Sequence, residues 1–126
     1  MEHIHTAADL DLQHEALENL LHRLKAIPEE PIAGERCSEL LAAINMMLSR
    51  HIAAEEKLIR DAALPDGLAR LHRDDHNRLI ETLVNYDMAA MQKLQITAGE
   101  LFEALFSACK AHQDAFDTQL HSVLAV

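Results

Sequence analysis

The sequence predicts an all-α protein, an up-down-up-down antiparallel four-helix bundle, from its composition, its periodicity and its chain breaks. The 126 residues include only three glycines and three prolines, aromatic residues make up 3%, and Ala and Leu are abundant. This composition favours helices over strands. Apolar residues recur at helical spacing in four segments that breakers or capping motifs separate. Short loops place neighbouring helices antiparallel, in one domain over residues 1–126.

The first two helices are delimited by prolines. We expect the first over about residues 6–27, from a capping box that begins at Thr6 to the break at Pro28. We expect the second over about residues 33–63, because a helix cannot easily continue through Pro65. Their apolar stripes are Leu10, Leu17, Leu20, Leu21 and Leu24 in the first helix, and Leu40, Leu41, Ile44, Met47, Leu48 and Ile52 in the second.

The last two helices meet near a second capping box. We expect the third over about residues 66–94, and the fourth from the capping box at Thr97 and Glu100 to about Leu124. The apolar stripe of the third helix is Leu68, Leu71, Leu79, Leu83, Tyr86 and Met91. These stripes are sufficient to build the core of the bundle.

The charge and hydropathy of the chain exclude some classes of binding partner. A formal net charge of −10 argues against nucleic acid and against an anionic membrane surface. No apolar run approaches the roughly 20 residues that span a bilayer. The N-terminus lacks a basic region followed by an apolar stretch, so we expect no signal peptide and a cytoplasmic location. Cys37 and Cys109 form no metal-finger spacing and are expected to be thiols in a reducing compartment.

Histidine is the compositional exception, with nine in the chain. His72 and His76 are four apart and therefore share one helical face, where a single metal ion can bind both. Helix rise then places other ligands beside them. His51 and Glu55 lie about 12 and 8 residues before the second turn, and His72 and His76 about 6 and 10 residues after it.

The same count brings all four helices to one layer, although the first hairpin needs a slip of about 7 Å that a longer loop can absorb. The candidate ligands are His14, His51, Glu55, His72, His76, His112 and Asp117. Five imidazoles and two carboxylates would be costly to bury without partners, and a metal centre resolves that cost. Seven groups exceed the needs of one tetrahedral ion, so two ions are expected, bridged by Glu55 and Asp117.

The motifs that carry these residues resemble the ligand set of the hemerythrin family. They are Asp11-Leu12-Gln13-His14, His51-Ile52-Ala53-Ala54-Glu55-Glu56, His72-Arg73-Asp74-Asp75-His76 and His112-Gln113-Asp114-Ala115-Phe116-Asp117. The resemblance spans essentially the whole chain. It implies two non-haem irons, one bound by His14 and His51, the other by His72, His76 and His112, with both carboxylates and an oxo or hydroxo group as bridges.

The resemblance also implies a function. One iron is closed by six ligands, and the other keeps a position open for a small molecule. A histidine-rich set favours the diferrous state, so reversible binding of dioxygen, in carriage or storage, is expected. The implied partners are dioxygen or another small oxidant and, if the irons cycle, a reductase.

The expected pocket departs from the family pattern. Leu17, Ile52 and Phe116 can supply an apolar lining, but Cys109 and Gln113 stand near the fourth-helix histidine, where the family usually has bulky apolar residues. We therefore expect a wider and wetter pocket than in a dedicated oxygen carrier, and a shorter-lived oxygenated form.

Three further expectations concern spacing. His112 and Asp117 are five apart, so they either flank the site from two sides or are brought together by a π-bulge. Glu56 has the wrong register for a ligand and is expected to face solvent. Cys37 lies about 21 Å along the bundle from the site, which excludes a disulfide with Cys109.

Three other functions compete with oxygen binding. A di-iron enzyme acting on peroxide or nitric oxide would use the same ligands, and so would a sensor or an iron-handling module. A metal-free interaction bundle would purify without iron.

Overall fold

The computed structural model describes residues 7–61 and 65–114, with the side chains of the first helix described from Leu12 onward. These ranges contain four helices: α1 (Ala7–Lys25), α2 (Glu35–Asp61), α3 (Asp66–Met91) and α4 (Ala98–His112). Within them the only strand-like pairing is a single bridge between Pro31 and Thr97. The prediction of an all-helical, four-helix architecture is confirmed.

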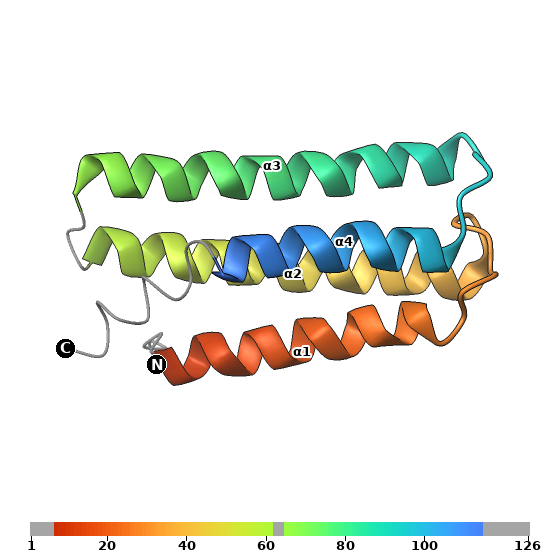
Figure 1. The fold of residues 1–126 in the computed structure, drawn as a ribbon, viewed down its shortest axis with the longest axis horizontal. Coiled ribbons are helices and arrows are strands. Elements are labelled where there is room, and N and C mark those ends of the chain that lie inside the picture. The colour runs from red at the N-terminus through yellow and green to blue at the C-terminus, as the bar shows by residue number, and fades with distance from the viewer. Residues whose placement is uncertain (1–6, 62–64, 115–126) are drawn as a thin grey trace.

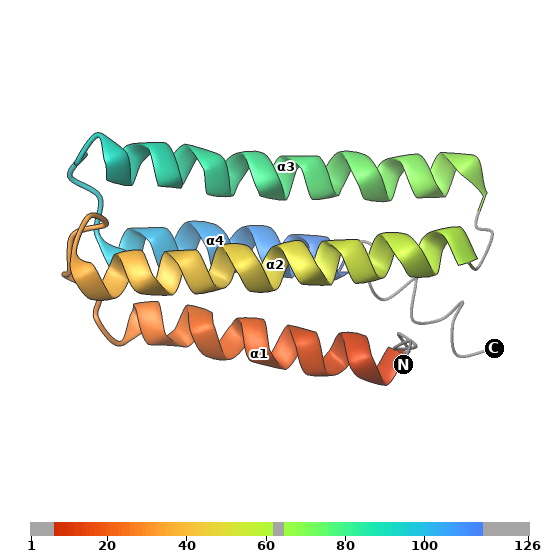
Figure 2. The ribbon, with the colours of Figure 1, turned by 180° about the vertical axis from the view of Figure 1, so that it is seen from behind.

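The four helices lie side by side as a bundle (Figures 1 and 2). Both α1 and α3 contact both α2 and α4, so α1 lies opposite α3 and α2 lies opposite α4. The α1–α2 and α3–α4 connections lie at one end of the bundle, and α2 ends and α3 begins at the other (Figure 1). None of the helices in the described ranges is long and apolar enough to cross a membrane.

Within the described ranges, the observed helix ends differ from the predicted ones by a few residues, and the predicted end of the fourth helix near Leu124 lies outside these ranges. The largest difference in the described ranges is at α3, which ends at Met91, three residues before the predicted end. Lys93 adopts a left-handed conformation with φ of 55°, and the N–H of Leu94 donates back to the carbonyl of Ala89 at 3.0 Å. This Schellman-type closure stops the helix without a glycine, which the apolar pattern could not reveal.

The start of α4 agrees with the predicted capping box. Thr97 has an extended backbone, and its hydroxyl oxygen accepts a hydrogen bond from the N–H of Glu100 at 3.3 Å. The other predicted capping residue, Thr6, lies outside the described residues.

The two connections at the common end of the bundle are hydrogen-bonded to each other. The N–H of Ile32 donates to the carbonyl of Ile96 at 2.7 Å, and the N–H of Ala98 donates to the carbonyl of Glu30 at 2.8 Å. These bonds couple the start of α2 to the start of α4, two elements that lie far apart in the sequence.

The carboxylate of Glu30 caps α2. It accepts the backbone N–H of Cys37 at 2.5 Å and the Nε–H of Arg36 at 2.8 Å. The hydrogen bond from Cys37 lowers the pKa of Glu30, burial opposes the shift, and Arg36 lowers the pKa further. A Cβ at Gly34 would lie 2.7 Å from Cγ of Glu30, so a larger residue at this position would displace the Glu30 side chain. A negative group here also complements the helix dipole.

Most of the core is apolar. Its largest fully buried apolar side chains are Leu21, Leu24, Ile32, Ile44 and Leu101. A smaller cluster forms around Ala54, Leu58 and Ile59 of α2, with Ala69 packed against it. Along α2, His51 and Glu55 lie where the first cluster gives way to the second. The polar residues therefore occupy a layer inside the core.

Candidate metal centre

Six of the seven predicted ligands lie in the described ranges, and the structure brings them into one buried layer. Each is at most 9% exposed: His14, His51, Glu55, His72, His76 and His112. The four-residue spacing on α2 and on α3 places two side chains of each helix on the face that points inward. The seventh, Asp117, lies outside the described residues.

Glu55 is the centre of the layer. Its Oε1 lies 3.0 Å from Nε2 of His76, 3.2 Å from Nε2 of His112 and 3.5 Å from Nε2 of His51. These histidines come from α3, α4 and α2, so a single carboxylate from α2 faces imidazoles of three helices.

The ligand atoms form two groups of three that share Glu55. Within each group the atoms lie within 4.8 Å of one another. We name the two groups the first half-site, which is His14, His51 and Glu55, and the second half-site, which is Glu55, His76 and His112.

His72 lies beside the second half-site without belonging to either group. Its ring centroid is 6.0 Å from that of His76 and 6.1 Å from that of His112. The side chain is completely buried. The structure therefore places it in the layer, and its role as a ligand stays a prediction.

The outward ring nitrogens of the histidines contact residues that sequence reasoning missed. The Nδ1–H of His51 donates to Oε1 of Gln13, from α1, at 2.8 Å. The Nδ1–H of His76 donates to Oε2 of Glu56, from α2, at 3.1 Å. The prediction that Glu56 faces solvent was wrong, because its side chain is only 33% exposed and bridges to α3. Such contacts fix the tautomer and leave Nε2 to bind a metal.

Asp75 of α3 makes the same kind of hydrogen bond to His112 of α4. Its Oδ2 accepts the Nδ1–H of His112, and its Oδ1 accepts a hydrogen bond from Nη2 of Arg78 at 2.9 Å. Partial burial raises the pKa of Asp75, but the hydrogen bonds and charges of Arg78 and His112 outweigh it and leave the pKa lowered. Asp75 is therefore a carboxylate near neutral pH.

One signal could have found these three residues in the sequence. Gln13, Glu56 and Asp75 each stand next to a predicted ligand in the chain. Being adjacent to a ligand placed each of them near the layer. The sequence could not show that each one hydrogen-bonds a histidine of the following helix.

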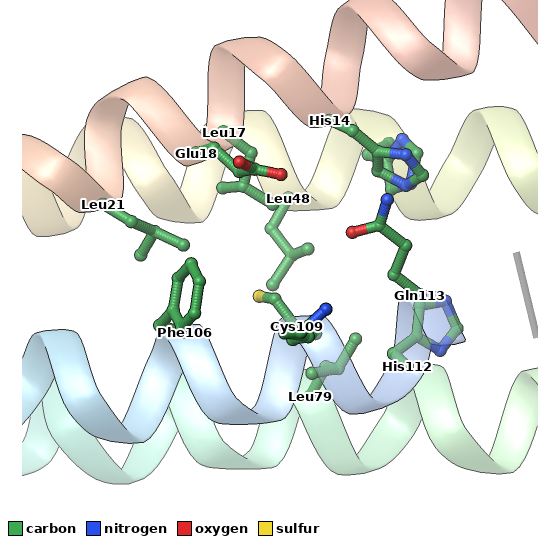
Figure 3. A pocket seen from close by; sticks show the side chains of 12 residues that line it. His14, Leu17, Glu18, Leu21, Leu48, Leu79, Phe106, Cys109, His112 and Gln113 are labelled. Atoms are coloured by element: carbon green, nitrogen blue, oxygen red, sulfur yellow. The ribbon is translucent and has the colours of Figure 1, made fainter. Parts of the chain in front are cut away.

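A cavity of about 150 Å³ borders the layer, mainly between α1, α2 and α4. Its walls are largely apolar and include Leu17, Leu21, Leu48 and Phe106 (Figure 3). His14, His51 and His112 also line it, so the cavity opens onto both histidines of the first half-site. The cavity is a place where a small molecule can reach that half-site.

Three of the five residues predicted to line the pocket do line this cavity. Leu17, Cys109 and Gln113 line the cavity, and the carboxamide of Gln113 extends from α4 toward His14 (Figure 3). Ile52 is buried in the apolar core instead and is not among the lining residues. Phe116 lies outside the described residues.

The backbone directly after α4 is relevant to the five-residue spacing of His112 and Asp117. The chain continues with π-type hydrogen bonding at Gln113 and Asp114. This is one of the two predicted ways to bring residues five apart to the same site.

The layer fits a metal ion. Glu55 is completely buried, and among the described residues its Oε2 has no hydrogen-bond partner. A buried carboxylate in this condition is costly unless a cation or a donor meets it. Imidazole nitrogens and carboxylate oxygens are common ligands of zinc, iron and other transition metals.

Four helices around a buried histidine and carboxylate layer define a metal-binding four-helix bundle. The comparison with protein families gives the particular group. The sequence matches the hemerythrin family, described as the hemerythrin HHE cation binding domain, over residues 5–123. The chain therefore belongs to the hemerythrin family and carries a cation-binding domain. Neither a comparison with curated proteins nor one with solved structures gave a match.

Proposed function

We propose that the protein holds two non-haem irons in this layer and binds dioxygen reversibly. The first half-site would hold one iron, the second half-site with His72 would hold the other, and Glu55 with Asp117 would bridge them. Two ferrous ions, if held there, would supply the two electrons that dioxygen takes up on binding. The proposal uses the predicted up-down-up-down order, which the course of the chain in Figure 1 supports.

One observation carries the proposal, namely that Glu55 is shared by two groups of ligands. A carboxylate with histidines on several sides can bridge two cations, whereas one tetrahedral ion would leave part of the layer unused. The excess of imidazole over carboxylate also supports reversible binding. Carboxylate-rich bundles of the ferritin type place several Glu residues at their metals, and anionic ligands favour ferric iron.

The cavity supports a small apolar ligand. Dioxygen has no charge, and the leucines and Phe106 provide an apolar path to His14 and His51. The same side chains limit the access of water to the first half-site, and this would slow the release of reduced oxygen as peroxide, a loss that leaves both irons oxidised.

The test is to load metal-free protein with ferrous iron under anaerobic conditions and then to add dioxygen. We expect two irons and one dioxygen per chain, a visible charge-transfer band, and return to the starting spectrum when argon removes the gas. Glu55→Gln should lower iron content, and Asp74→Asn, at an exposed neighbour of the layer, should not. Irreversible oxidation in the first exposure, or fewer than two irons, would overturn the proposal.

A di-iron enzyme or sensor acting on peroxide or nitric oxide is the second candidate. The polar part of the cavity wall favours it, since Glu18, Lys110 and Gln113 line the cavity beside the apolar residues. Polar groups admit water and protons and can shorten the lifetime of bound oxygen. Turnover of hydrogen peroxide or nitric oxide at many equivalents per iron would support this candidate, and an oxygenated form that lasts for days would contradict the wetter pocket.

A further inference from the structure

The cavity beside the layer is larger than dioxygen needs. Its volume is about 150 Å³. Dioxygen has two heavy atoms and needs roughly the space of one or two water molecules, each of which takes up about 30 Å³ in the liquid. More than half of the cavity would therefore remain unfilled around dioxygen, and side chains that line unfilled space lose dispersion contacts.

The wall of the cavity consists mostly of apolar side chains, which come from all four helices. They are Leu17 and Leu21 of α1, Leu48 of α2, Leu79 of α3 and, less deeply buried, Phe106 of α4. Leucine and phenylalanine side chains offer water no hydrogen-bond partner. Cavities of about this volume that are lined by such side chains stay dry and bind benzene or xenon.

The part of the wall that Phe106 forms is held in place by other rings. The ring of Phe106 stacks on that of Phe102, with centroids 5.3 Å apart and planes 24° apart, and the ring centroid of His22 lies 6.1 Å away. Phe102 is itself buried. A preformed wall binds a ligand at a smaller cost in conformational entropy, and the ring of Phe106 can pack against an aromatic ligand.

A ligand can enter the cavity from solvent between α1 and α4. Glu18 of α1 and Lys110 of α4 also line the cavity, and both residues are exposed. Their charges are opposite, and Nζ of Lys110 lies 3.5 Å from Oδ2 of Asp114. Charges of both signs at the entrance select neither an anion nor a cation, and the apolar wall disfavours both.

We propose that this cavity is a binding site for a small, uncharged, apolar organic molecule of about the size of benzene, a class of ligand different from dioxygen. The site is formed by the chain alone and needs no iron, so it does not depend on the proposed function. His14 and His51 line the same cavity. An occupant would therefore share its space with any molecule that approaches the first half-site.

The test is a calorimetric titration of the full chain with benzene, both as purified and after removal of any metal. We expect saturable binding of one equivalent per chain in both forms. Benzoate carries the same ring with a negative charge. It should bind the metal-free form at least about 10-fold more weakly than benzene, because the apolar wall does not compensate for burial of a carboxylate.

Cys109 offers a variant that fills the cavity, because its side chain lines the wall from α4. Cys109→Phe should put a ring into the space that benzene occupies and weaken binding by more than about 10-fold. Cys109→Ala removes the thiol without filling the cavity and should bind benzene as the wild type does. Ser107→Phe is the matched control, since it adds the same ring at an exposed position of the same helix.

Circular dichroism and thermal unfolding check that each variant is folded. Xenon provides a second measurement that needs no variant. In crystals of the wild type under xenon pressure, we expect a xenon atom against Leu17 and Leu48, which line the cavity.

Absence of saturable benzene binding, or an empty cavity under xenon pressure, would overturn the inference. Equal binding of benzene by Cys109→Phe and the wild type would also overturn it, because the ligand would then lie elsewhere. The same holds if Cys109→Ala or Ser107→Phe weakened binding as much as Cys109→Phe, and equal binding of benzoate would overturn the assignment to uncharged ligands. None of these results depends on two irons or on dioxygen, so this inference and the proposed function can fail separately.

Discussion

The two parts of the core differ sharply in chemistry although the same four helices build both. Toward the end where the connections pair, α1, α2 and α4 bury Leu24, Ile44 and Leu101. About two helical turns along α1 from Leu21, His14 enters a layer that buries five imidazoles and one carboxylate. The apolar part gains stability from burial alone. The polar layer loses by burial unless its groups are met by hydrogen bonds or a cation.

This difference separates folding from metal binding. The apolar part is large and continuous, so it can hold the helices together before any cation arrives. The histidines of the polar layer are then already oriented for a metal, because Gln13, Glu56 and Asp75 hydrogen-bond three of them. Substitutions in the two parts should therefore respond differently to the presence of metal.

The largest effect on stability is expected in the apolar part. Leu24→Ala removes a fully buried side chain and should lower the free energy of unfolding by about 2–5 kcal/mol. The loss should be the same with and without bound metal, because Leu24 is not part of the layer. Urea unfolding of both forms measures it. A loss confined to the metal-loaded form would show that the two parts are not separable.

A substitution in the layer should behave in the opposite way. His72→Leu replaces a buried ring with an apolar side chain that fills most of the same space, so the metal-free protein should lose far less stability than Leu24→Ala does. Metal-dependent stabilisation should fall, because one proposed ligand is lost. Thermal unfolding with and without zinc measures both quantities.

His72→Leu thus tests the one layer residue that stands outside the two half-sites. If zinc stabilised this variant as much as the wild type, His72 would not be a ligand. If the metal-free variant were destabilised as strongly as Leu24→Ala, the layer would contribute to folding as much as the apolar part does.

The smallest effect on stability is expected at the paired connections. Among the described loop residues, Glu30 is the one whose pKa is clearly shifted. Its pKa is lowered, chiefly by the N–H of Cys37, so its contribution to stability is present above the unfolded value of about 4.3 and is lost as the pH falls through the lower folded value. Glu30→Gln should therefore flatten the loss of stability between about pH 5 and pH 3. Exposed Glu29→Gln is the control and should follow the wild-type profile.

Much of the fold could be predicted because helices depend on local signals. The apolar stripes, the prolines and the Thr97 cap act over a few residues, and α2 and α4 begin within two residues of the expected positions. The end of α3 could not be predicted in the same way, since Lys93 adopts a conformation that usually requires glycine.

The composition of the buried layer was also accessible from the sequence. A fixed rise per residue converts positions in the chain into depth, so counting from the turns is enough to bring His51 and His76 to one level. For His14 the count was off by about 7 Å, and the structure shows that it reaches the same layer. Depth alone says nothing of rotation. Glu56 was expected in solvent because it follows Glu55 by one residue and so points about 100° away on an isolated helix.

The sequence by itself thus determined the four helices and the depth at which their polar side chains meet. Only the tertiary structure decided which ring nitrogen faces which acceptor, where the cavity opens, and how Glu30 reaches the start of α2. These contacts depend on how each helix is rotated about its own axis and on the neighbour packed against it. Both are set by the simultaneous packing of all four helices rather than by any local run of residues.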